Sequence, residues 1–337
     1  MGITIEDIAN KAGVSIATVS RVINGSKPVS NELRLKVMSA IDECNFKPNA
    51  LAKGLVTRTT HIIGIVLPDI GNPVFGNLIK GLNRVVSARG YTLMITDSEG
   101  KVANERKLLD IMAEKQADGV IFAGVHIEDD LIRFMKEKSF PIVLVSNMPC
   151  DGSAKMNTVL LNNTLAVGQA IDYLFEKGHR RIAYIGGPEH DYSSGYLRLL
   201  GYQEALHRQG LEFETNLVRY GDFTYDSGYA LMQSIVKTNL NLPTAVFAAS
   251  DVMAAGALNY LHDQGIRIPE EVSVMGLDDS PVAVYTRPAL TTIRFSYIEE
   301  GVKAASLLLD MIDGRLKDTA IHYVPHQIIE RQSVGRR

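Results

Sequence analysis

The chain has 337 residues, of which 22% are charged and 46% hydrophobic, so it is long enough for two or three globular domains and too apolar for a disordered protein. Its net charge is −3, yet residues 1–60 hold 8 Lys and Arg against 5 Asp and Glu, while the rest hold 27 against 33. No signal peptide or membrane-length apolar run is found, and the two cysteines lie in no metal-ligand spacing, which predicts a cytoplasmic protein that binds neither a membrane nor a metal.

The first 46 residues predict three short helices. The first lies between a capping Thr4 and a terminating Gly13, with an apolar stripe of Ile5, Ile8, Ala9 and Ala12. The second follows a capping Ser15 and ends at Asn24-Gly25, with an inner stripe of Ile16, Val19, Val22 and Ile23. The third follows a capping Ser30, with an apolar face of Leu33, Val37, Ala40, Ile41 and Cys44. Two short helices joined by a tight turn and closed by a third predict an all-α helix-turn-helix.

The second helix carries small polar side chains on its expected outer face, namely Ala17, Thr18, Ser20 and Arg21. Slender side chains let a helix enter the major groove of DNA, where hydroxyls contact phosphates or base edges and an arginine reaches guanine. The basic excess of the first 60 residues agrees with a DNA-binding head. The alternative is a three-helix bundle that binds nothing, with Arg21 merely solvated.

The segment from Thr4 to Leu55 resembles the DNA-binding head and hinge of the lac repressor (LacI/GalR) family of bacterial transcriptional regulators, through the motifs AGVS, TVSRVING and FKPNALAKGL. The resemblance implies that Ile16, Ala17 and Arg21 read major-groove bases, and that a hinge helix forms on DNA and inserts Leu55 into the minor groove. Off DNA, the hinge is expected to be a flexible linker. The DNA-contacting residues expected in full are Thr4, Ser15, Ile16, Ala17, Thr18, Ser20, Arg21, Asn24, Asn49, Ala52, Lys53 and Leu55.

From His61 onward, buried strand-like runs alternate with amphipathic helical segments. The strand-like runs are IIGIVLPD, YTLMITDS, DGVIFAG, PIVLVSN, RIAYIGG, LVRYG, TAVFAAS, VSVMGLDD and LTTIRF. Such alternation predicts doubly wound parallel sheets, and there are too many strands for one sheet. We therefore expect an α/β body of two lobes with a cleft between them, similar to periplasmic binding proteins.

The predicted organisation is a helix-turn-helix domain over residues 1–46, a hinge over 47–60 and a two-lobed body over 61–337 that binds an effector and forms the dimer. One lobe is expected to comprise about 61–161 plus 290–320. The other is expected to comprise 162–289 plus 321–333.

Short polar side chains follow several predicted strands, where open α/β sheets bind their ligands. They are Asp69, His126, Ser146-Asn147, Ser250-Asp251 and Asp278-Asp279, with Arg198, Phe75 and Phe223 in nearby helices and loops. A carboxylate and a guanidinium beneath an aromatic ring suit a sugar or a similar polar ligand. The alternatives are a surface charge for Arg198, helix capping for Asp69 and Asp251, a core position for Phe75 and a capped turn at Asp278-Asp279.

The body also resembles the effector-binding core of the lac repressor family, through PDIGNPVF, GHRRIAYIGGP, AASDVMAAGAL, GIRIPEEVSVMGLDDSP and RPALTTIR. The effector-binding residues expected in full are Asp69, Phe75, Ser146, Arg198, Phe223, Ser250, Asp278 and Phe295. Ser250 stands where the family usually has Asn, and Phe295 where some sugar-binding members have Gln. These two departures make the pocket less polar, so the expected effector is a sugar or related metabolite, with a nucleobase or nucleoside left open.

An enzyme on the same scaffold is the competing class, but the sequence holds no phosphate loop, dinucleotide fingerprint, zincin motif or nucleophile elbow. Adjacent Asp278 and Asp279 diverge from a strand end and do not face each other across a bond, as glycosidase carboxyls must. A transport solute-binding protein would lack the basic head. The sequence thus predicts a cytoplasmic, sequence-specific DNA-binding regulator and repressor without a cofactor, acting as a homodimer on a pseudo-palindromic double-stranded operator.

Overall fold

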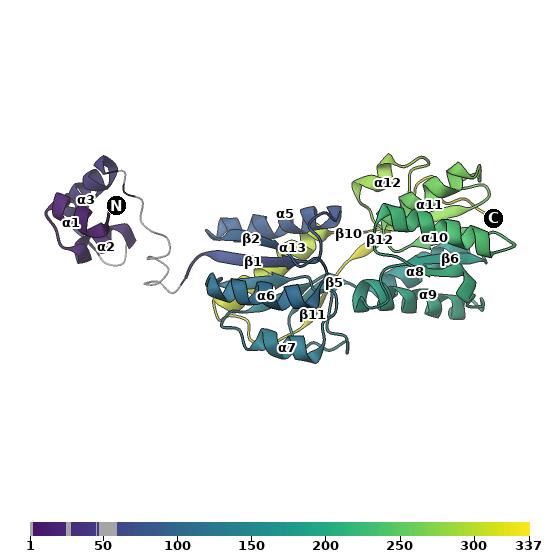
Figure 1. The fold of residues 1–337 in the computed structure, drawn as a ribbon, viewed down its shortest axis with the longest axis horizontal. Coiled ribbons are helices and arrows are strands. Elements are labelled where there is room, and N and C mark those ends of the chain that lie inside the picture. The colour runs from purple at the N-terminus through teal and green to yellow at the C-terminus, as the bar shows by residue number, and fades with distance from the viewer. Residues whose placement is uncertain (1–2, 25–27, 45, 47–58) are drawn as a thin grey trace. The chain divides into compact units, whose positions relative to one another are not determined.

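The computed structural model describes residues 3–24, 28–44, 46 and 59–337, which belong to two compact units, one ending at His61 and one starting at Ile62 (Figure 1). The expected hinge contacts Asn49, Ala52, Lys53 and Leu55 lie outside the described residues. No described helix is long and apolar enough to cross a membrane.

The first unit is a helix-turn-helix, as predicted, built from α1 (Ile5–Ala12), α2 (Ile16–Asn24) and α3 (Asn31–Glu43). Thr4 and Asp7 form a capping box at the start of α1, and Gly13 ends it in the left-handed conformation, with φ 66°. Ser30 caps α3 by accepting a hydrogen bond from the Leu33 amide. The buried core consists of Ile8, Ala9, Val19, Val37 and Ala40.

Ile16 does not belong to the inner stripe of α2, contrary to the prediction from periodicity. Its side chain is 46% exposed, whereas Val19 is fully buried. Side chains of an α-helix tilt toward its N-terminus, so a residue at the first helical position points past the end of the helix and away from the core. Ile16 therefore shares the outer surface with Ala17 and Arg21, both of which are exposed.

The second unit contains two six-stranded sheets, which confirms the predicted pair of doubly wound lobes. Sheet A has the spatial order β11 (Ile321–Val324), β5 (Thr158–Leu161), β4 (Ile142–Val145), β3 (Gly119–Phe122), β1 (Ile62–Leu67), β2 (Thr92–Asp97) and is parallel throughout. Sheet B has the spatial order β12 (His326–Ile329), β10 (Thr291–Phe295), β9 (Ser273–Asp278), β8 (Ala245–Ala248), β6 (Ile182–Gly186), β7 (Val218–Tyr220). It is parallel except for β12, an edge strand that runs antiparallel to β10.

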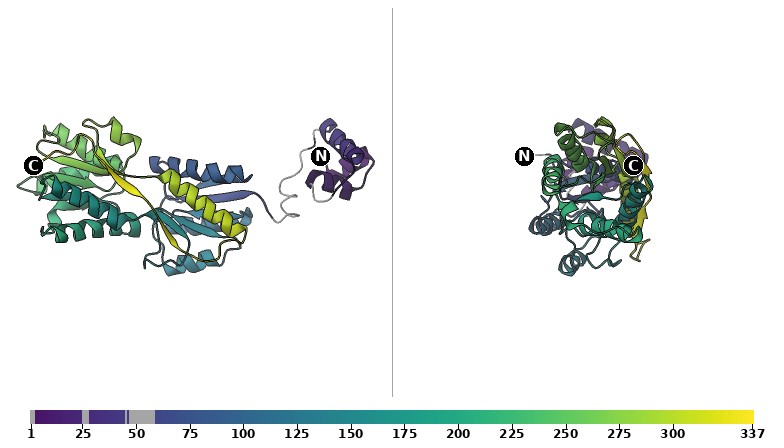
Figure 2. Two further views of the ribbon diagram at one scale, coloured as in Figure 1. Left: turned by 180° about the vertical axis from the view of Figure 1, so that it is seen from behind. Right: turned by 90° about the vertical axis from the view of Figure 1, so that its right-hand side faces the viewer.

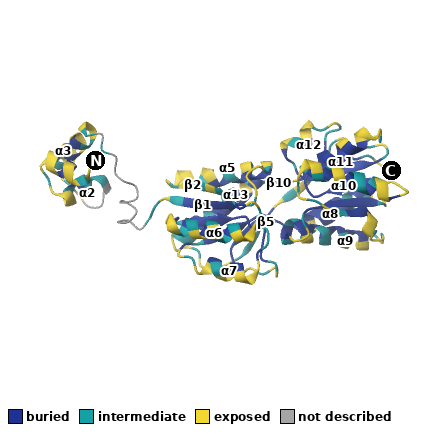
Figure 3. Ribbon diagram, in the orientation of Figure 1, coloured by how far each residue is buried: buried dark blue, intermediate teal, exposed yellow. Residues whose placement is uncertain are grey.

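Helices flank both sheets, so the central strands are dark blue and the outer faces of the helices are yellow in Figure 3. Sheet A is accompanied by α5 (Pro73–Ala88), α6 (Val102–Glu114), α7 (Asp129–Lys136) and α13 (Tyr297–Ile312). Sheet B is accompanied by α8 (Asn163–Glu176), α9 (Leu197–Arg208), α10 (Tyr225–Thr238), α11 (Asp251–Asp263), α12 (Pro281–Tyr285), a π-helical turn (Tyr192–Tyr196) and a 3-10 turn (Thr215–Leu217).

The chain passes between the lobes three times, after β5, after β10 and between β11 and β12 (Figure 2). The expected division of the tail is therefore wrong in two places, because β10 belongs to sheet B and β11 to sheet A. Both strands are short, with mixed polar and apolar residues that fit either sheet, and only their partners assign them. Thr291 of β10 pairs with Met275 of β9, and Ile321 of β11 pairs with Thr158 of β5.

Candidate functional site

A cavity of about 610 Å³ lies between the two lobes, within the range typical of small-molecule sites. In each sheet the strand order reverses once: β1 lies between β2 and β3, and β6 lies between β7 and β8. Ligands of open α/β sheets bind beyond the carboxyl ends of the strands at such a reversal. In sheet A, Asp69 follows β1 and Ala123 follows β3. In sheet B, Pro188 follows β6 and Ser250 follows β8, and all four residues line the cavity.

The structure brings together all of the effector-binding residues expected from the sequence. The cavity wall includes Asp69, Phe75, Ser146, Arg198, Phe223, Ser250, Asp278 and Phe295. These side chains come from both lobes and are separated by up to 226 positions, from Asp69 to Phe295.

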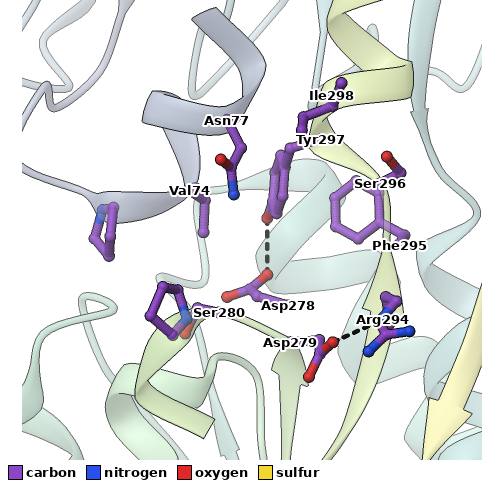
Figure 4. A pocket seen from close by; sticks show the side chains of 12 residues that line it. Val74, Asn77, Asp278, Asp279, Ser280, Arg294, Phe295, Ser296, Tyr297 and Ile298 are labelled. Atoms are coloured by element: carbon purple, nitrogen blue, oxygen red, sulfur yellow. Dashed lines mark hydrogen bonds and ion pairs between the residues drawn. The ribbon is translucent and has the colours of Figure 1, made fainter. Parts of the chain in front are cut away.

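Asp278 is a buried carboxyl of the cavity, at the end of β9 with φ 120°, a backbone conformation that residues other than glycine rarely adopt. It is 8% exposed and accepts a 2.7 Å hydrogen bond from the hydroxyl of Tyr297 (Figure 4). Burial raises the pKa of Asp278 to about 6, although the Arg198 charge and the Tyr297 hydrogen bond act in the opposite direction. Near pH 6 the carboxyl therefore changes between a protonated form, which can donate a hydrogen bond, and an ionised form, which only accepts.

Asp279 turns away from Asp278, as expected for adjacent residues at a strand end. Its carboxylate binds Arg294 and Arg331, both at 2.5 Å, and Figure 4 shows the Arg294 contact. The cavity thus has one member of the pair, and a two-carboxyl hydrolytic arrangement from these residues is not formed. A smaller hollow of about 190 Å³ lies beside the cavity and shares Asp278, Phe295 and Tyr297 with it.

Asp251 lies behind Asp278 and is fully buried. It accepts hydrogen bonds from the Ser280 amide at 2.7 Å and from the Thr292 hydroxyl at 2.5 Å. Burial and the negative charge of Asp278 raise the pKa of Asp251 well above its usual value. The alternative that Asp251 caps α11 is wrong, because Ser250 is the cap and accepts a 3.2 Å hydrogen bond from the Met253 amide.

Arg198 enters the cavity from α9 and is only 5% exposed, so the alternative of an ordinary surface charge is wrong. Its Nε donates to the Asn163 side chain at 2.8 Å, and its Nη1 donates to the Ala249 carbonyl at 2.5 Å. The guanidinium lies 6.0 Å from the centre of the Phe223 ring. The neighbouring Asn163 is itself part of the cavity wall.

Ser146 is fixed by a buried glutamate of α13. It has φ 60°, and both its amide and its hydroxyl donate to Oε1 of Glu300, at 2.6 Å and 3.0 Å. Because the hydroxyl proton is used in this way, the Ser146 oxygen faces the cavity as an acceptor. Burial raises the pKa of Glu300 to about 8, against the effect of the Ser146 hydrogen bonds.

Aromatic rings cover the apolar part of the cavity. Phe75, in the first turn of α5, belongs both to the core and to the cavity wall, so the expected core position is confirmed and its contact with an effector stays a prediction. Phe295 packs against Tyr297 with ring centres 4.2 Å apart. Asp69 does not cap α5, contrary to one alternative; it accepts a 2.7 Å hydrogen bond from the Gly71 amide, and Asn72 is the cap.

Contacts between the lobes flank the cavity on the side of the π-helical turn. Asn147 donates to Asp191 at 3.3 Å, and the Met148 amide donates to the Ser193 hydroxyl at 3.1 Å. His126 Nδ1 lies 2.9 Å from the His190 carbonyl. Burial lowers the pKa of His126, but its hydrogen bonds to that carbonyl and to Glu128 together raise it. His126 thus joins the lobes and does not line the cavity.

Several cavity residues were not predicted from the sequence, above all Tyr297, Asn163 and Asp191. Tyr297 and Asn163 follow two of the three strands after which the chain changes lobe, β10 and β5, and assigning β10 to sheet B would have pointed to Tyr297. Asp191 precedes the π-helical turn, which the sequence pattern does not indicate. No group of described His, Cys, Asp and Glu side chains is arranged to hold a metal ion.

The outer face of α2 in the first unit presents the other expected contact residues. Ala17 and Arg21 are exposed, and no hydrogen bond or ion pair joins Arg21 to another described residue. The Ser15 hydroxyl lies 2.9 Å from the Thr18 hydroxyl and accepts from the Thr18 amide at 3.2 Å, so both fix the start of α2. Thr4 belongs to the capping box, Ser20 is half-buried and Asn24 ends α2.

Two family models match the chain. Residues 4–49 match the model of bacterial regulatory proteins of the lacI family, and residues 171–334 match a periplasmic binding protein-like domain. Catabolite control protein A of Priestia megaterium is 31% identical over 99% of both chains. The HTH-type transcriptional regulator CelR of Thermobifida fusca is 36% identical over 98% of both chains.

Solved structures agree with these matches over the whole chain. A complex of the transcriptional regulator CelR with cellobiose is similar with a TM-score of 0.76 at 35% identity, covering 98% of this chain and 99% of that one. The lac repressor dimer bound to operator and the anti-inducer ONPF has a TM-score of 0.89 at 24% identity, covering 99% of this chain and 100% of that one. The second likeness establishes the common fold.

Proposed function

This chain belongs to the lacI family of bacterial regulatory proteins, and from that premise we propose how its head and its cavity act together. It is a DNA-binding transcriptional regulator whose relatives are regulators and not enzymes. We propose that it is a repressor that works in the cytoplasm and whose operator affinity is set by a small molecule bound between the lobes.

One observation carries the proposal: eight side chains chosen from the sequence surround a single cavity at the two strand-order reversals. The Asp278 carboxyl and the Arg198 guanidinium can hold hydroxyl groups, and Phe75, Phe223 and Phe295 can cover the apolar face of a ring. This chemistry supports a sugar or a related metabolite. The cellobiose complex of CelR supports the same class.

The head is proposed to read double-stranded DNA through Ile16, Ala17 and Arg21 on α2. One head covers a half-site, so two heads related by a two-fold axis would read a pseudo-palindrome. A homodimer is supported by the dimeric lac repressor, whose fold this chain shares. Sedimentation of the full chain should give the mass of a dimer.

Arg21→Ala tests the head directly. Genomic DNA fragments retained by the full chain would first be sequenced to find the operator, and binding to operator variants would then be measured by fluorescence anisotropy. We expect the variant to lose about 1–3 kcal/mol of binding at one operator position and to become indifferent to the base there.

Lys36→Ala is the matched control, because this substitution also removes one positive charge from the head. Lys36 lies on α3 and pairs with Glu32 at 2.9 Å. The control should keep its preference at that base. A base-reading role for Arg21 would be contradicted if both variants lost their base preference equally, or if Arg21→Ala kept its preference as the control does.

A further inference from the structure

We propose that the cavity selects an effector that carries no negative charge: a saccharide without phosphate or carboxylate groups. This inference rests on the proposed effector site and names the chemical class that the site takes. Three properties of the cavity wall carry it, namely its charge, the state of its single arginine and the capping of the helices that point at it.

Acidic side chains dominate the described cavity wall. Five carboxyl groups line it, on Asp69, Glu99, Asp191, Asp222 and Asp278. Against them stand one arginine, Arg198, and one histidine, His190. A phosphate group in this cavity would therefore meet repulsion from several sides, and such repulsion is little screened in a partly enclosed site.

The charge of Arg198 is already balanced by protein groups. Two of its nitrogens donate to Asn163 and to the Ala249 carbonyl. Its positive charge also acts on the carboxyls of Asp191 and Asp278, lowering the pKa of each against the effect of burial. Bidentate recognition of a phosphate uses two parallel N–H groups of a guanidinium, and two of the three nitrogens of Arg198 already donate to protein groups.

Helix N-termini are the other common anion sites, and here they are closed by side chains. The helices α8 and α13, whose first residues line the cavity, are capped by Asn162 and Ser296. Three more helices have their capping residue in the cavity wall itself. Their caps are Asn72 on α5, Thr224 on α10 and Ser250 on α11, and each accepts a 3.2 Å hydrogen bond from a first-turn amide. These amides are therefore not free to cradle a phosphate.

The same groups suit the hydroxyls of an uncharged saccharide. Carboxylates accept hydrogen bonds, and the Ser146 oxygen is also left as an acceptor because the Ser146 hydroxyl already donates its hydrogen bond to Glu300. A ligand rich in O–H donors satisfies this excess of acceptors. The rings of Phe75, Phe223 and Phe295 then cover its C–H faces.

A metabolite pool sorted by charge tests this inference with no candidate effector chosen in advance. Polar metabolites from bacteria grown on mixed carbohydrates would be passed over an anion-exchange resin at pH 7, giving a flow-through and a retained fraction. Thermal unfolding of the full chain would be followed with each fraction, and the bound molecule identified by native mass spectrometry. We expect the flow-through to raise the unfolding temperature, the retained fraction to leave it unchanged, and the bound mass to be that of a saccharide.

Asp278→Asn ties the response to this cavity, since it keeps the side-chain shape but removes the carboxylate, and it should abolish the shift. A shift produced by the retained fraction, or a nucleoside as the bound molecule, would overturn this inference and leave the proposed effector site standing. If neither fraction shifts the wild-type chain, the proposed effector site itself fails, and the inference fails with it.

Discussion

At the scale of single residues, the cavity depends on two buried carboxyl groups, Asp251 and Glu300, that do not line it. Asp251 holds the Ser280 amide and the Thr292 hydroxyl, and thereby supports the unusual backbone of Asp278. Gly276 makes room for it, since a Cβ there would clash with Asp251 Oδ1. Glu300 holds Ser146 in the same manner in the other lobe.

Asp251 is predicted to act through its hydrogen bonds and not through its charge. Asp251→Ala leaves two buried donors unpaired and should cost about 2–4 kcal/mol in the free energy of unfolding, with weakened effector binding. Asp251→Asn keeps an acceptor for Ser280 and offers a donor to Thr292, so it should cost less than about 1 kcal/mol. Thermal unfolding of both variants checks this; equal damage from both would show that the negative charge is what matters.

Glu300 is predicted to make the body less stable as the pH rises. Its pKa is raised from 4.5 to about 8, so between these values the folded protein keeps a proton that the unfolded chain releases. Unfolding is therefore progressively favoured from about pH 4.5 to pH 8, by at most about 5 kcal/mol. Glu300→Gln keeps the acceptor for Ser146 and removes the titration.

Urea unfolding at pH 5 and pH 8 measures this effect. The loss of stability between the two pH values should be smaller in Glu300→Gln than in the wild type. Glu299→Gln is the matched control on the same helix, because Glu299 is exposed, and it should behave like the wild type. An unchanged pH dependence in Glu300→Gln would mean that Glu300 is ionised in the folded protein.

At the scale of elements, glycines let helices approach closely where they carry cavity residues. A Cβ on Gly301 of α13 would clash with the Leu78 carbonyl, and one on Gly81 of α5 would clash with the Ile298 carbonyl. The cavity residue Tyr297 is the first residue of α13, and the cavity residue Phe75 lies in the first turn of α5. Their spacing therefore sets the distance between two parts of the cavity wall.

Gly301→Ala should force α5 and α13 apart. The clash is with backbone, which cannot rotate away, so we expect a loss of about 1–3 kcal/mol and a weaker effector response. Gly76→Ala is the control on α5, since a Cβ there meets nothing within 4 Å. The control should be neutral or stabilise by up to about 1 kcal/mol, as alanine favours helix. Equal thermal unfolding of the two variants would argue against close helix packing as the cause.

At the scale of the whole molecule, sequence periodicity was enough to predict the two α/β lobes and the residues at their strand ends. Four strand ends predicted a cavity residue because parallel strands deliver their carboxyl ends to one edge, whereas His126, after another strand, does not line the cavity. Asp69, Ser146, Ser250 and Asp278 are such residues, and all line the cavity. The helix caps Thr4 and Ser30 were likewise readable from local chemistry.

The sequence could not predict which lobe receives a strand from the tail. Strands β10 and β11 are short and of mixed polarity, so they fit either sheet, and their assignment depends on their strand partners. Tyr297 was missed for that reason. Ile16 was misplaced because periodicity treats the first helical residue like any other, whereas its side chain projects beyond the end of α2.

The central claim, that the cavity controls the head, is tested most directly by the operator affinity of the full chain with and without the effector found in the flow-through fraction. Fluorescence anisotropy would give the operator Kd for the wild type and for Asp278→Asn. We predict that the effector changes the wild-type Kd by at least about fivefold, and that operator reciprocally changes effector affinity by the same factor. Asp278→Asn should bind operator like the wild type without effector and show no change with it. A wild-type Kd indifferent to a bound effector, or a full response in Asp278→Asn, would contradict control of the head by this cavity.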